Sequence, residues 1–304
     1  MNLRRVACAV GLALAVVAST QVVASAAADP APTYYLALGD SLSVGYQPVH
    51  VDASGNTVPA GDTKDGYADQ LYPILSAKDP NLQLVKLGCS GETTTTMLNG
   101  STTLTGPNCD NYKGGNSQVK AAEAFLAAHP GQVKYVTNDI GANDVQRCAS
   151  AAGIDIACTV QGIATLAGNL PVILGRLRAA AGPTTTFVGM NYYNPFLAAY
   201  LTPGSNGKFL AAVTSLAEFA VNTIEENEYR TFGARIADVS GTFRSYDFFD
   251  QAVVPPFGTV PVNVANICNL TYMCSVSNIH ANLAGYRAIA DTFAAALNVP
   301  PRQG

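Results

Sequence analysis

The chain has 304 residues, of which 48% are hydrophobic and only 12% are charged, and its net charge is −4. This hydrophobic fraction excludes a disordered chain, because enough apolar side chains are present to bury a core. The acidic balance and the lack of a basic stripe exclude nucleic acid as a partner. The length suffices for one large domain.

The N-terminus has the pattern of a secretory signal peptide. Arg4 and Arg5 precede an apolar run over 6–23, and small residues follow it. A basic start, an apolar run and an Ala-x-Ala site predict cleavage, after either Ala26 or Ala28. A membrane anchor is the alternative, but nothing after the run resembles a stop-transfer segment.

We therefore predict a signal peptide over residues 1–28 and a single secreted domain over residues 29–304. No later segment is expected to be long and apolar enough to span a bilayer, so we expect no stable membrane anchor. Ser, Thr, Asn, Gln and Gly must cover most of the surface, which suits an extracellular protein. We expect a monomer, although no motif bears directly on the oligomeric state.

Six cysteines remain after the leader, which takes Cys8 with it. An even number in a secreted chain predicts disulfides, for which six cysteines allow about 15 connectivities. Zinc binding is the alternative, but there is no Cys-x-x-Cys pair or histidine cluster, so no metal is expected. Proximity in the sequence favours the pairs Cys89–Cys109, Cys148–Cys158 and Cys268–Cys274.

Apolar, β-branched runs alternate with helical patterns along the chain. Such alternation predicts an α/β fold, with a parallel sheet covered by helices on both faces. No internal repeat or interdomain linker interrupts it. The predicted strands cover 34–39, 83–88, 133–140, 184–191 and 234–239, and the predicted helices cover about 66–77, 117–129, 159–181, 205–231 and 282–297.

Three long segments rich in turn residues join these elements, over 47–65, 97–116 and 240–279. Loops of this length in compact domains are usually functional or disordered. The third carries many aromatic and branched side chains, which either hold the loop down or line an apolar groove beside an active site. They are Phe243, Tyr246, Phe248, Phe249, Val253, Val254, Phe257 and Val260.

A serine follows the first predicted strand at the edge where α/β folds bind their ligands. The apolar run over 34–38 ends at Gly39, and Ser41 comes two residues later. On its own, Gly-Asp-Ser is equally consistent with an ordinary turn. Acyl transfer by a serine also needs a base near the hydroxyl and donors aimed at the developing oxyanion.

Small-residue loops at the ends of two other predicted strands could supply the donors. Gly91 follows the strand at 83–88 and could offer a backbone N–H, whereas Asn143 follows the strand at 133–140 and could offer a side-chain amide. The mature chain has three candidate bases: His50 in a polar loop, His129 at a helix end and His280 just before the last helix. Each of these residues also has an ordinary structural interpretation.

The order of these pieces resembles the SGNH (GDSL-type) lipases and acylhydrolases. Gly39-Asp40-Ser41-Leu42-Ser43 matches the nucleophile block, Gly91 the glycine block, Gly141-x-Asn143-Asp144 the asparagine block and His280 the histidine block. The six cysteines also resemble those of secreted actinobacterial members. No Gly-x-Ser-x-Gly elbow surrounds Ser41, which disfavours the α/β-hydrolase fold.

The resemblance implies a three-layer, flavodoxin-like α/β/α sandwich with a mostly parallel five-stranded sheet. It implies that Ser41 is the nucleophile and His280 the general base. The oxyanion hole would consist of the backbone N–H groups of Ser41 and Gly91 and the amide of Asn143. Asp40 and Asp144 would stabilise their turns, and no cofactor would be needed.

One position departs from the family pattern. The acid that orients the histidine commonly stands three residues before it, where this chain has Ser277, or two residues before it, where this chain has Asn278. We expect a backbone carbonyl near Ser277 to hold the imidazole, leaving a Ser–His dyad. A carboxylate from the long third loop (Asp247 or Asp250) is the second possibility, and a slow or inactive enzyme is the third.

The sequence therefore predicts a secreted serine esterase or lipase that hydrolyses small-molecule or lipid carboxylic esters through an acyl-enzyme on Ser41. A carbohydrate deacetylase or a phospholipase of the same chemistry is one alternative. A secreted binding protein that has kept the scaffold and lost catalysis is another, because function must be argued from the site rather than from the fold.

Overall fold

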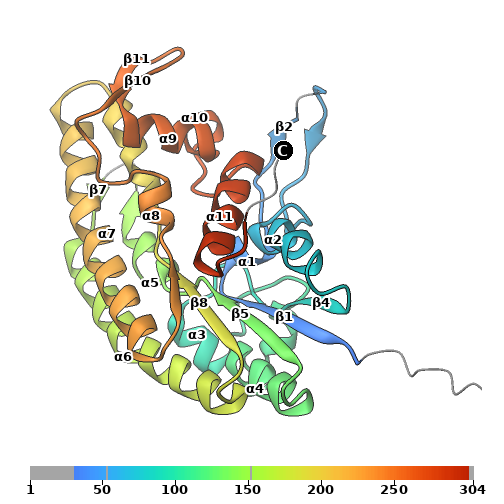
Figure 1. Ribbon diagram of the computed structural model, residues 1–304. Helices are drawn as coiled ribbons and strands as arrows, with labels where there is room; N and C mark the ends of the chain where they lie inside the picture. The colour runs from blue at the N-terminus through green and yellow to red at the C-terminus, as the bar shows by residue number, and fades with distance from the viewer. Residues whose placement is uncertain (1–30, 53, 151–152, 301–304) are drawn as a thin grey trace, which may run out of the picture. The chain divides into compact units, whose positions relative to one another are not determined.

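Five parallel strands form the central sheet, in the order β4-β1-β5-β8-β9 (Figure 1). The computed structural model describes residues 31–52, 54–150 and 153–300. Numbered along the chain, the order is 2-1-3-4-5, which is the flavodoxin-like arrangement. The strands are β1 (Thr33–Leu38), β4 (Leu82–Lys86), β5 (Val133–Asn138), β8 (Thr186–Met190) and β9 (Arg235–Ala237).

Helices cover both faces of this sheet, because alternate residues of its strands point to opposite sides. In β1, Tyr35 and Ala37 belong to one buried cluster, whereas Leu36 and Leu38 belong to the other. The first cluster is completed by α2 (Tyr67–Ser76) and α11 (Leu283–Ala296), and the second by α4 (Gln118–Ala128), α6 (Ile156–Ala181) and α7 (Ser205–Thr231). The predicted three-layer α/β/α fold is confirmed.

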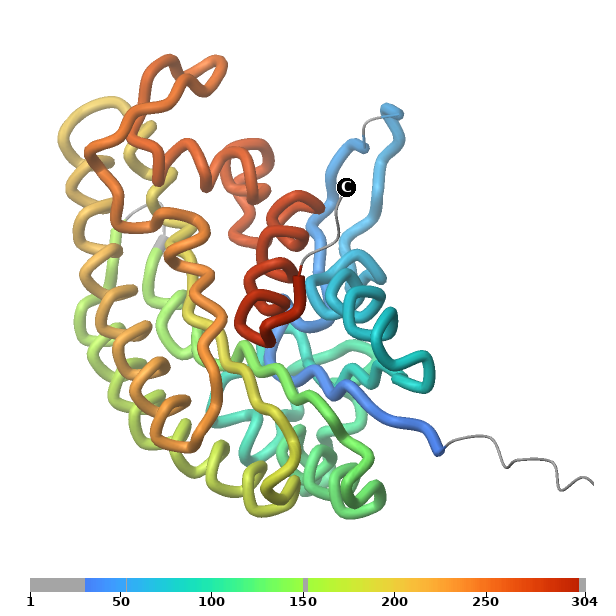
Figure 2. The backbone as a smooth tube through the Cα atoms, viewed as in Figure 1, coloured from blue at the N-terminus to red at the C-terminus, as the bar shows by residue number. Residues whose placement is uncertain are grey.

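Two of the three segments expected to be long loops contain hairpins, and all three contain regular structure. Figure 2 shows two hairpins projecting at the top of the view, β2–β3 and β10–β11. Their strands are β2 (His50–Val51), β3 (Thr57–Val58), β10 (Gln251–Val254) and β11 (Gly258–Pro261). A third hairpin joins β6 (Ala149–Ser150) to β7 (Gly153–Ile154).

Short helices fill the remaining connections. Those nearest the sheet edge are α1 (Ser41–Val44), α3 (Thr94–Asn99) and α5 (Ala142–Val145). The segment 240–279 contains α9 (Val262–Leu270) and α10 (Met273–Val276), so it is not a loop without structure. The other short elements are the helix α8 (Val239–Thr242) and the 3₁₀ turns η1 (Cys109–Tyr112), η2 (Gln146–Cys148) and η3 (Pro195–Leu201).

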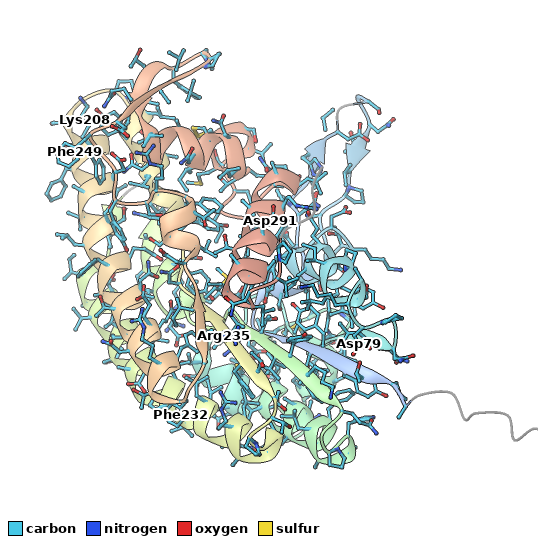
Figure 3. The ribbon with its side chains drawn as sticks, in the orientation of Figure 1. Asp79, Lys208, Phe232, Arg235, Phe249 and Asp291 are labelled. Carbon is cyan, nitrogen blue, oxygen red and sulfur yellow. A yellow bond between two sulfur atoms is a disulfide. The ribbon has the colours of Figure 1, made fainter. Side chains whose placement is uncertain are left out.

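The apolar side chains of the third segment divide into two groups. Phe243 is fully buried and stacks on Tyr193 with ring centroids 4.5 Å apart, which holds the segment against the domain. Phe249 is 90% exposed and projects from the surface (Figure 3). None of these side chains lines the cavity at Ser41, so the groove interpretation is wrong for that cavity.

α6 corrects the expectation that no later segment could span a bilayer. By length and composition alone it is long and apolar enough, with a mean hydropathy of 1.5 in its most apolar stretch. It nevertheless packs along α3, α4 and α7 and supplies Leu166, Leu170 and Leu177 to the core. A core helix of a domain satisfies the same two criteria, and these contacts favour that interpretation.

Three disulfides tie connecting segments together: Cys89–Cys109, Cys148–Cys158 and Cys268–Cys274. These are the pairs favoured by proximity in the sequence. Disulfides of this kind are typical of chains that fold in an oxidising compartment. The predicted signal peptide over 1–28 lies outside the described residues.

Candidate active site

Ser41 is the first residue of α1, directly beyond the carboxyl end of β1. The preceding Asp40 caps this short helix by accepting the backbone N–H of Leu42 at 3.1 Å. Gly39 has a φ of +126°, and a Cβ atom built on it would lie 1.6 Å from Oδ1 of Asp139. Only glycine meets both conditions, so the turn that presents Ser41 depends on it.

His280 reaches Ser41 from the other end of the chain. Its Nε2 lies 2.8 Å from Oγ of Ser41, and its Nδ1 lies 2.7 Å from Oδ1 of Asn278. The backbone N–H of His280 donates to the same Oδ1 at 3.1 Å, which identifies that atom as the amide oxygen. Because this oxygen only accepts, Nδ1 carries the proton, and Nε2 is free to accept the hydroxyl hydrogen of Ser41.

Asn278 therefore takes the place of the missing acid, which corrects two expectations. The acceptor for Nδ1 is a side-chain oxygen rather than a backbone carbonyl near Ser277. Asp247 and Asp250 do not reach the ring, since both carboxylates pair with the guanidinium of Arg244. Ser277 adopts a left-handed conformation with φ 54°, at the turn that leads into Asn278.

Burial lowers the pKa of His280 to about 4. The ring packs against Tyr46, with the ring centroids 4.5 Å apart. In the described part of the chain, the partner of Nδ1 is an amide oxygen and not a carboxylate, so the loss of hydration dominates. His280 is therefore neutral at neutral pH, which is the form able to accept a proton.

Asn143 lines the same cavity as Ser41, but its amide hydrogens already have acceptors. Nδ2 donates to Oδ2 of Asp40 at 3.1 Å and to the carbonyl oxygen of Glu92 at 2.9 Å. A negatively charged oxygen in the cavity would have to share one of these hydrogens. Asn143 is thus positioned beside Ser41 by the loop that follows β1 and the loop that follows β4.

Gly91 precedes Glu92 in the loop after β4, with a φ of +82°. It is solvent-exposed and is not among the residues that line the cavity at Ser41. The structure therefore brings Ser41, Asn143 and His280 together and places Gly91 next to the residue that anchors Asn143.

The other two histidines lie in ordinary structural positions. Nδ1 of His50 contacts the carbonyl oxygen of Pro48 at 2.9 Å. Nδ1 of His129 contacts that of Phe125 at 2.9 Å, at the end of α4. These contacts agree with a structural role for His50 and His129.

A buried polar network holds the loops of the site together, and the sequence pattern did not reveal it. The carboxamide of Gln118 accepts the N–H of Gly39 at 2.7 Å and donates to its carbonyl at 2.9 Å. It also donates to the carboxylate of Glu92 at 3.1 Å. Asp144 accepts the N–H and the hydroxyl of Thr94 at 2.8 and 2.7 Å, which agrees with a structural role.

Two small cavities adjoin one another at the sheet edge. The one at Ser41 has a volume of about 10 Å³ and the second about 20 Å³, each is partly open to solvent, and Gln146 lines both. The first is lined by Asp40, Ser41, Leu42, Ala142, Asn143, Gln146, Tyr192, Tyr193, Ile279 and His280. The second is lined by Val145, Gln146, Ala149, Ile154, Thr159, Asn194, Phe196, Thr214, Ala217, Glu218 and Val221.

The model of the GDSL-like lipase/acylhydrolase family matches residues 37–288, which include all four predicted blocks. The chain belongs to this family. Among the described residues, no group of three or more His, Cys, Asp or Glu side chains could hold a metal ion. No curated protein sequence matches the chain.

Several solved structures are similar to this chain over most of their length. A putative GDSL-like lipase from Parabacteroides merdae superposes with a TM-score of 0.51 at 13% identity, covering 88% of this chain and 97% of that one. An extracellular lipase from Streptomyces rimosus gives a TM-score of 0.47 at 20% identity, covering 88% and 98%. An acetyl xylan esterase from Geobacillus stearothermophilus gives 0.48 at 13% identity, covering 90% and 98%.

Proposed function

We propose that this member of the GDSL-like family is a secreted serine esterase that hydrolyses carboxylic esters through an acyl-enzyme on Ser41. Family membership supports ester hydrolysis in general. The observation that carries the proposal is the hydrogen-bonded chain from Oγ of Ser41 through the ring of His280 to the amide oxygen of Asn278. Nucleophile, base and orienting group thus stand in the order that acyl transfer requires.

In the first half-reaction, Oγ of Ser41 attacks the ester carbonyl carbon while its hydroxyl proton passes to Nε2 of His280. The carbonyl electron pair becomes an oxyanion. When the tetrahedral intermediate collapses, the bond to the alcohol oxygen breaks, and the imidazolium returns the proton to that oxygen. In the second half-reaction a water molecule repeats these steps on the acyl-enzyme and releases the carboxylic acid.

The oxyanion would receive hydrogen bonds from the backbone N–H of Ser41 and from the amide of Asn143, which both line the cavity. The N–H of Gly91, the third donor that the family resemblance implies, would have to reach the oxyanion from outside the residues that line this cavity. Loss of one such donor typically costs about 2.7–4 kcal/mol of barrier. Asn143 would turn one hydrogen from Asp40 or Glu92 toward the oxyanion as charge develops. The donor would then be stronger in the transition state than in the resting enzyme, which is the condition for raising kcat.

The size of the cavities favours a short acyl group. Ligand pockets usually enclose about 300–1,000 Å³, so the space of about 10 Å³ at Ser41 leaves little room for the acyl group. The neighbouring cavity at Gln146 is similarly small, at about 20 Å³. The same observation favours a carbohydrate deacetylase as the second candidate, because an acetyl group is the shortest common acyl group.

A fluorophosphonate probe tests the proposal directly. We expect covalent labelling at Ser41 in the wild type and none in the Ser41→Ala variant, because only an activated serine attacks the phosphorus. Turnover of nitrophenyl esters should fall by about 10⁶-fold in the same variant. The matched control is Ser43→Ala, which removes a neighbouring buried hydroxyl that donates to the carbonyl of Asp40 at 2.7 Å.

The same experiment separates the alternatives. Equal labelling of wild type and Ser41→Ala would refute an acyl-enzyme on Ser41. A folded protein without labelling or turnover on any ester would support the non-catalytic binding protein. Comparing nitrophenyl acetate, butyrate and octanoate with acetylated sugars would distinguish an esterase from a deacetylase.

A further inference from the structure

Two carboxyl groups lie buried on the sheet side of Ser41, and the proposed mechanism uses neither. Asp40 follows β1 and Asp139 follows β5, the neighbouring strand, where Leu38 pairs with Asn138. Their exposed fractions are 2% and 0%. Because Gly39 has no side chain, the carboxyl of Asp139 occupies the space beside it, within reach of the carboxyl of Asp40.

Asp40 is surrounded by hydrogen-bond donors. Its Oδ1 accepts the N–H of Leu42 at 3.1 Å. Its Oδ2 accepts the amide of Asn143 at 3.1 Å and the hydroxyl of Tyr192 at 3.4 Å. A carboxylate can only accept, whereas a protonated carboxyl would have to turn its hydrogen toward one of these donors. The surroundings of Asp40 therefore suit its ionised form.

Asp139 has fewer hydrogen-bond donors around its carboxyl group than Asp40 has. Its Oδ1 accepts the hydroxyl of Tyr67 at 3.4 Å. Its Oδ2 is buried and receives no hydrogen bond from the described residues. A buried carboxylate oxygen without a donor is unfavourable. A proton on Oδ2 would make this oxygen a donor and so remove that cost.

No cation in the described part of the chain offsets the pair, since neither carboxyl takes part in an ion pair there. Burial raises the pKa of both groups, and their proximity raises that of Asp139 further. Two buried carboxyls within reach of each other cannot both ionise readily. The titratable groups that face the pair from the surrounding elements are Tyr35, Tyr67, Tyr192, Tyr193, Glu225, Tyr229 and Tyr286.

We propose that Asp139 is a positioning residue, a carboxylic acid that donates its proton to the carboxylate of Asp40 and so fixes the groups that Asp40 holds. Those groups are the amide of Asn143 and the N–H of Leu42 at the turn that presents Ser41. This inference rests on the proposed function, because the positioned groups are those of the proposed reaction. Asp139 touches no substrate and acts only through Asp40.

Two variants of Asp139 test the proposal. Asp139→Asn keeps the shape and an N–H donor toward Asp40, whereas Asp139→Leu keeps the approximate size and removes the donor. At pH 7 we expect kcat to stay within about threefold of wild type in Asp139→Asn and to fall roughly 10- to 100-fold in Asp139→Leu, with little change in KM. Equal kcat in the two variants would overturn the proposal.

The pH profile gives a readout that a packing role would not change. In the wild type, kcat/KM should fall at alkaline pH as the pair loses its shared proton and two like charges face each other. An amide cannot lose that proton, so this alkaline decline should be absent in Asp139→Asn. An identical decline in both proteins would contradict the proposal.

An infrared difference spectrum tests the proposal even if Asp139→Leu does not fold. The wild type minus Asp139→Asn difference at pH 7 should contain the carbonyl stretch of a protonated carboxyl group. Absence of that band would overturn the proposal even if the enzyme is active. If the band is present but Ser41 is not labelled by the fluorophosphonate, the proposed esterase function fails and the protonated pair stands.

Discussion

The two sides of Ser41 are built from different chemical groups. On one side, His280 is oriented by the neutral amide of Asn278 at 2.7 Å. On the other side, the buried carboxyl of Asp40 holds the turn at Ser41 and the amide of Asn143, and the carboxyl of Asp139 lies beside Gly39. The carboxyl groups of this site therefore lie next to the serine turn and not next to the histidine.

This difference separates two tasks that a Ser-His-Asp triad combines. The acid of a triad both holds the imidazole in the correct tautomer and stabilises the imidazolium, and its replacement by an amide costs about 10⁴-fold through the wrong tautomer. Here the amide oxygen faces Nδ1, because the backbone N–H of His280 fixes its orientation. The tautomer is correct, and only the stabilising charge is missing.

The largest effect is expected on the carboxyl side. Asn143→Ala should lower kcat by about 10²–10³-fold, because it removes an oxyanion donor and leaves Asp40 with one partner fewer. Steady-state kinetics with nitrophenyl acetate measure this. Gln146→Ala is the matched control, since Gln146 lines the same cavity and should cost less than about threefold. Similar losses in both variants would mean that Asn143 only shapes the cavity.

Substitutions on the histidine side should lower kcat less, and they should change the pKa of His280. Asn278→Ala should lower kcat by about 10- to 100-fold, because the ring loses the partner that sets its tautomer. Asn278→Asp should raise the pKa of His280 above its value of about 4, since an ionised carboxylate favours the imidazolium. NMR titration of the histidine ring protons measures this shift. Ser277→Ala is the control and should leave the pKa unchanged.

The smallest effect is a difference in how the two sides respond to pH. The pKa of Asp139 is raised in the folded state, so the folded protein keeps a proton that the unfolded chain releases near pH 3.9. The free energy of unfolding that this proton contributes therefore decreases as the pH rises. The pKa of His280 is lowered in the folded state, so the opposite dependence applies to this residue. The free energy of unfolding that the neutral ring contributes decreases as the pH falls from about 6.5 toward about 4.

Thermal unfolding between pH 4 and pH 8 checks these signs. Relative to wild type, Asp139→Asn should gain stability as the pH rises, whereas His280→Gln should gain stability as the pH falls. Each relative change should exceed about 1 kcal/mol, or roughly 2–4 °C in Tm for a domain of this size. Parallel curves for wild type and either variant would contradict the corresponding assignment.

The long elements of the fold were predictable because their patterns are strong. β1 and α11 lie within about a residue of the expected 34–39 and 282–297, since an apolar run and a helical apolar face each extend over the whole element. α9 and the β10–β11 hairpin were missed, because the segment 240–279 is rich in turn residues and has no long periodic pattern. Its order comes instead from tertiary packing, such as that of Phe243 on Tyr193.

The site was predictable only where a motif marks it. Ser41, Asn143 and His280 each stand in a recognisable block, whereas the role of Asn278 depends on the left-handed turn at Ser277, which has no clear sequence signal. Asp139 had a signal that was overlooked. Thr137-Asn138-Asp139 is a polar run within a predicted buried strand, and polar residues there need a partner inside the protein.

The contact between Ser41 and His280 spans 239 residues of sequence. Ribosomes synthesise the nucleophile turn early and the histidine late, so the two groups cannot meet until nearly all of the chain has been made. Contacts of such long range also form late in folding, because the intervening chain must be ordered first. A nascent or truncated chain that lacks α11 and the turn before it contains the serine but no base. The proposed ester hydrolysis thus depends on the fold that brings the turn after β1 to the segment before α11.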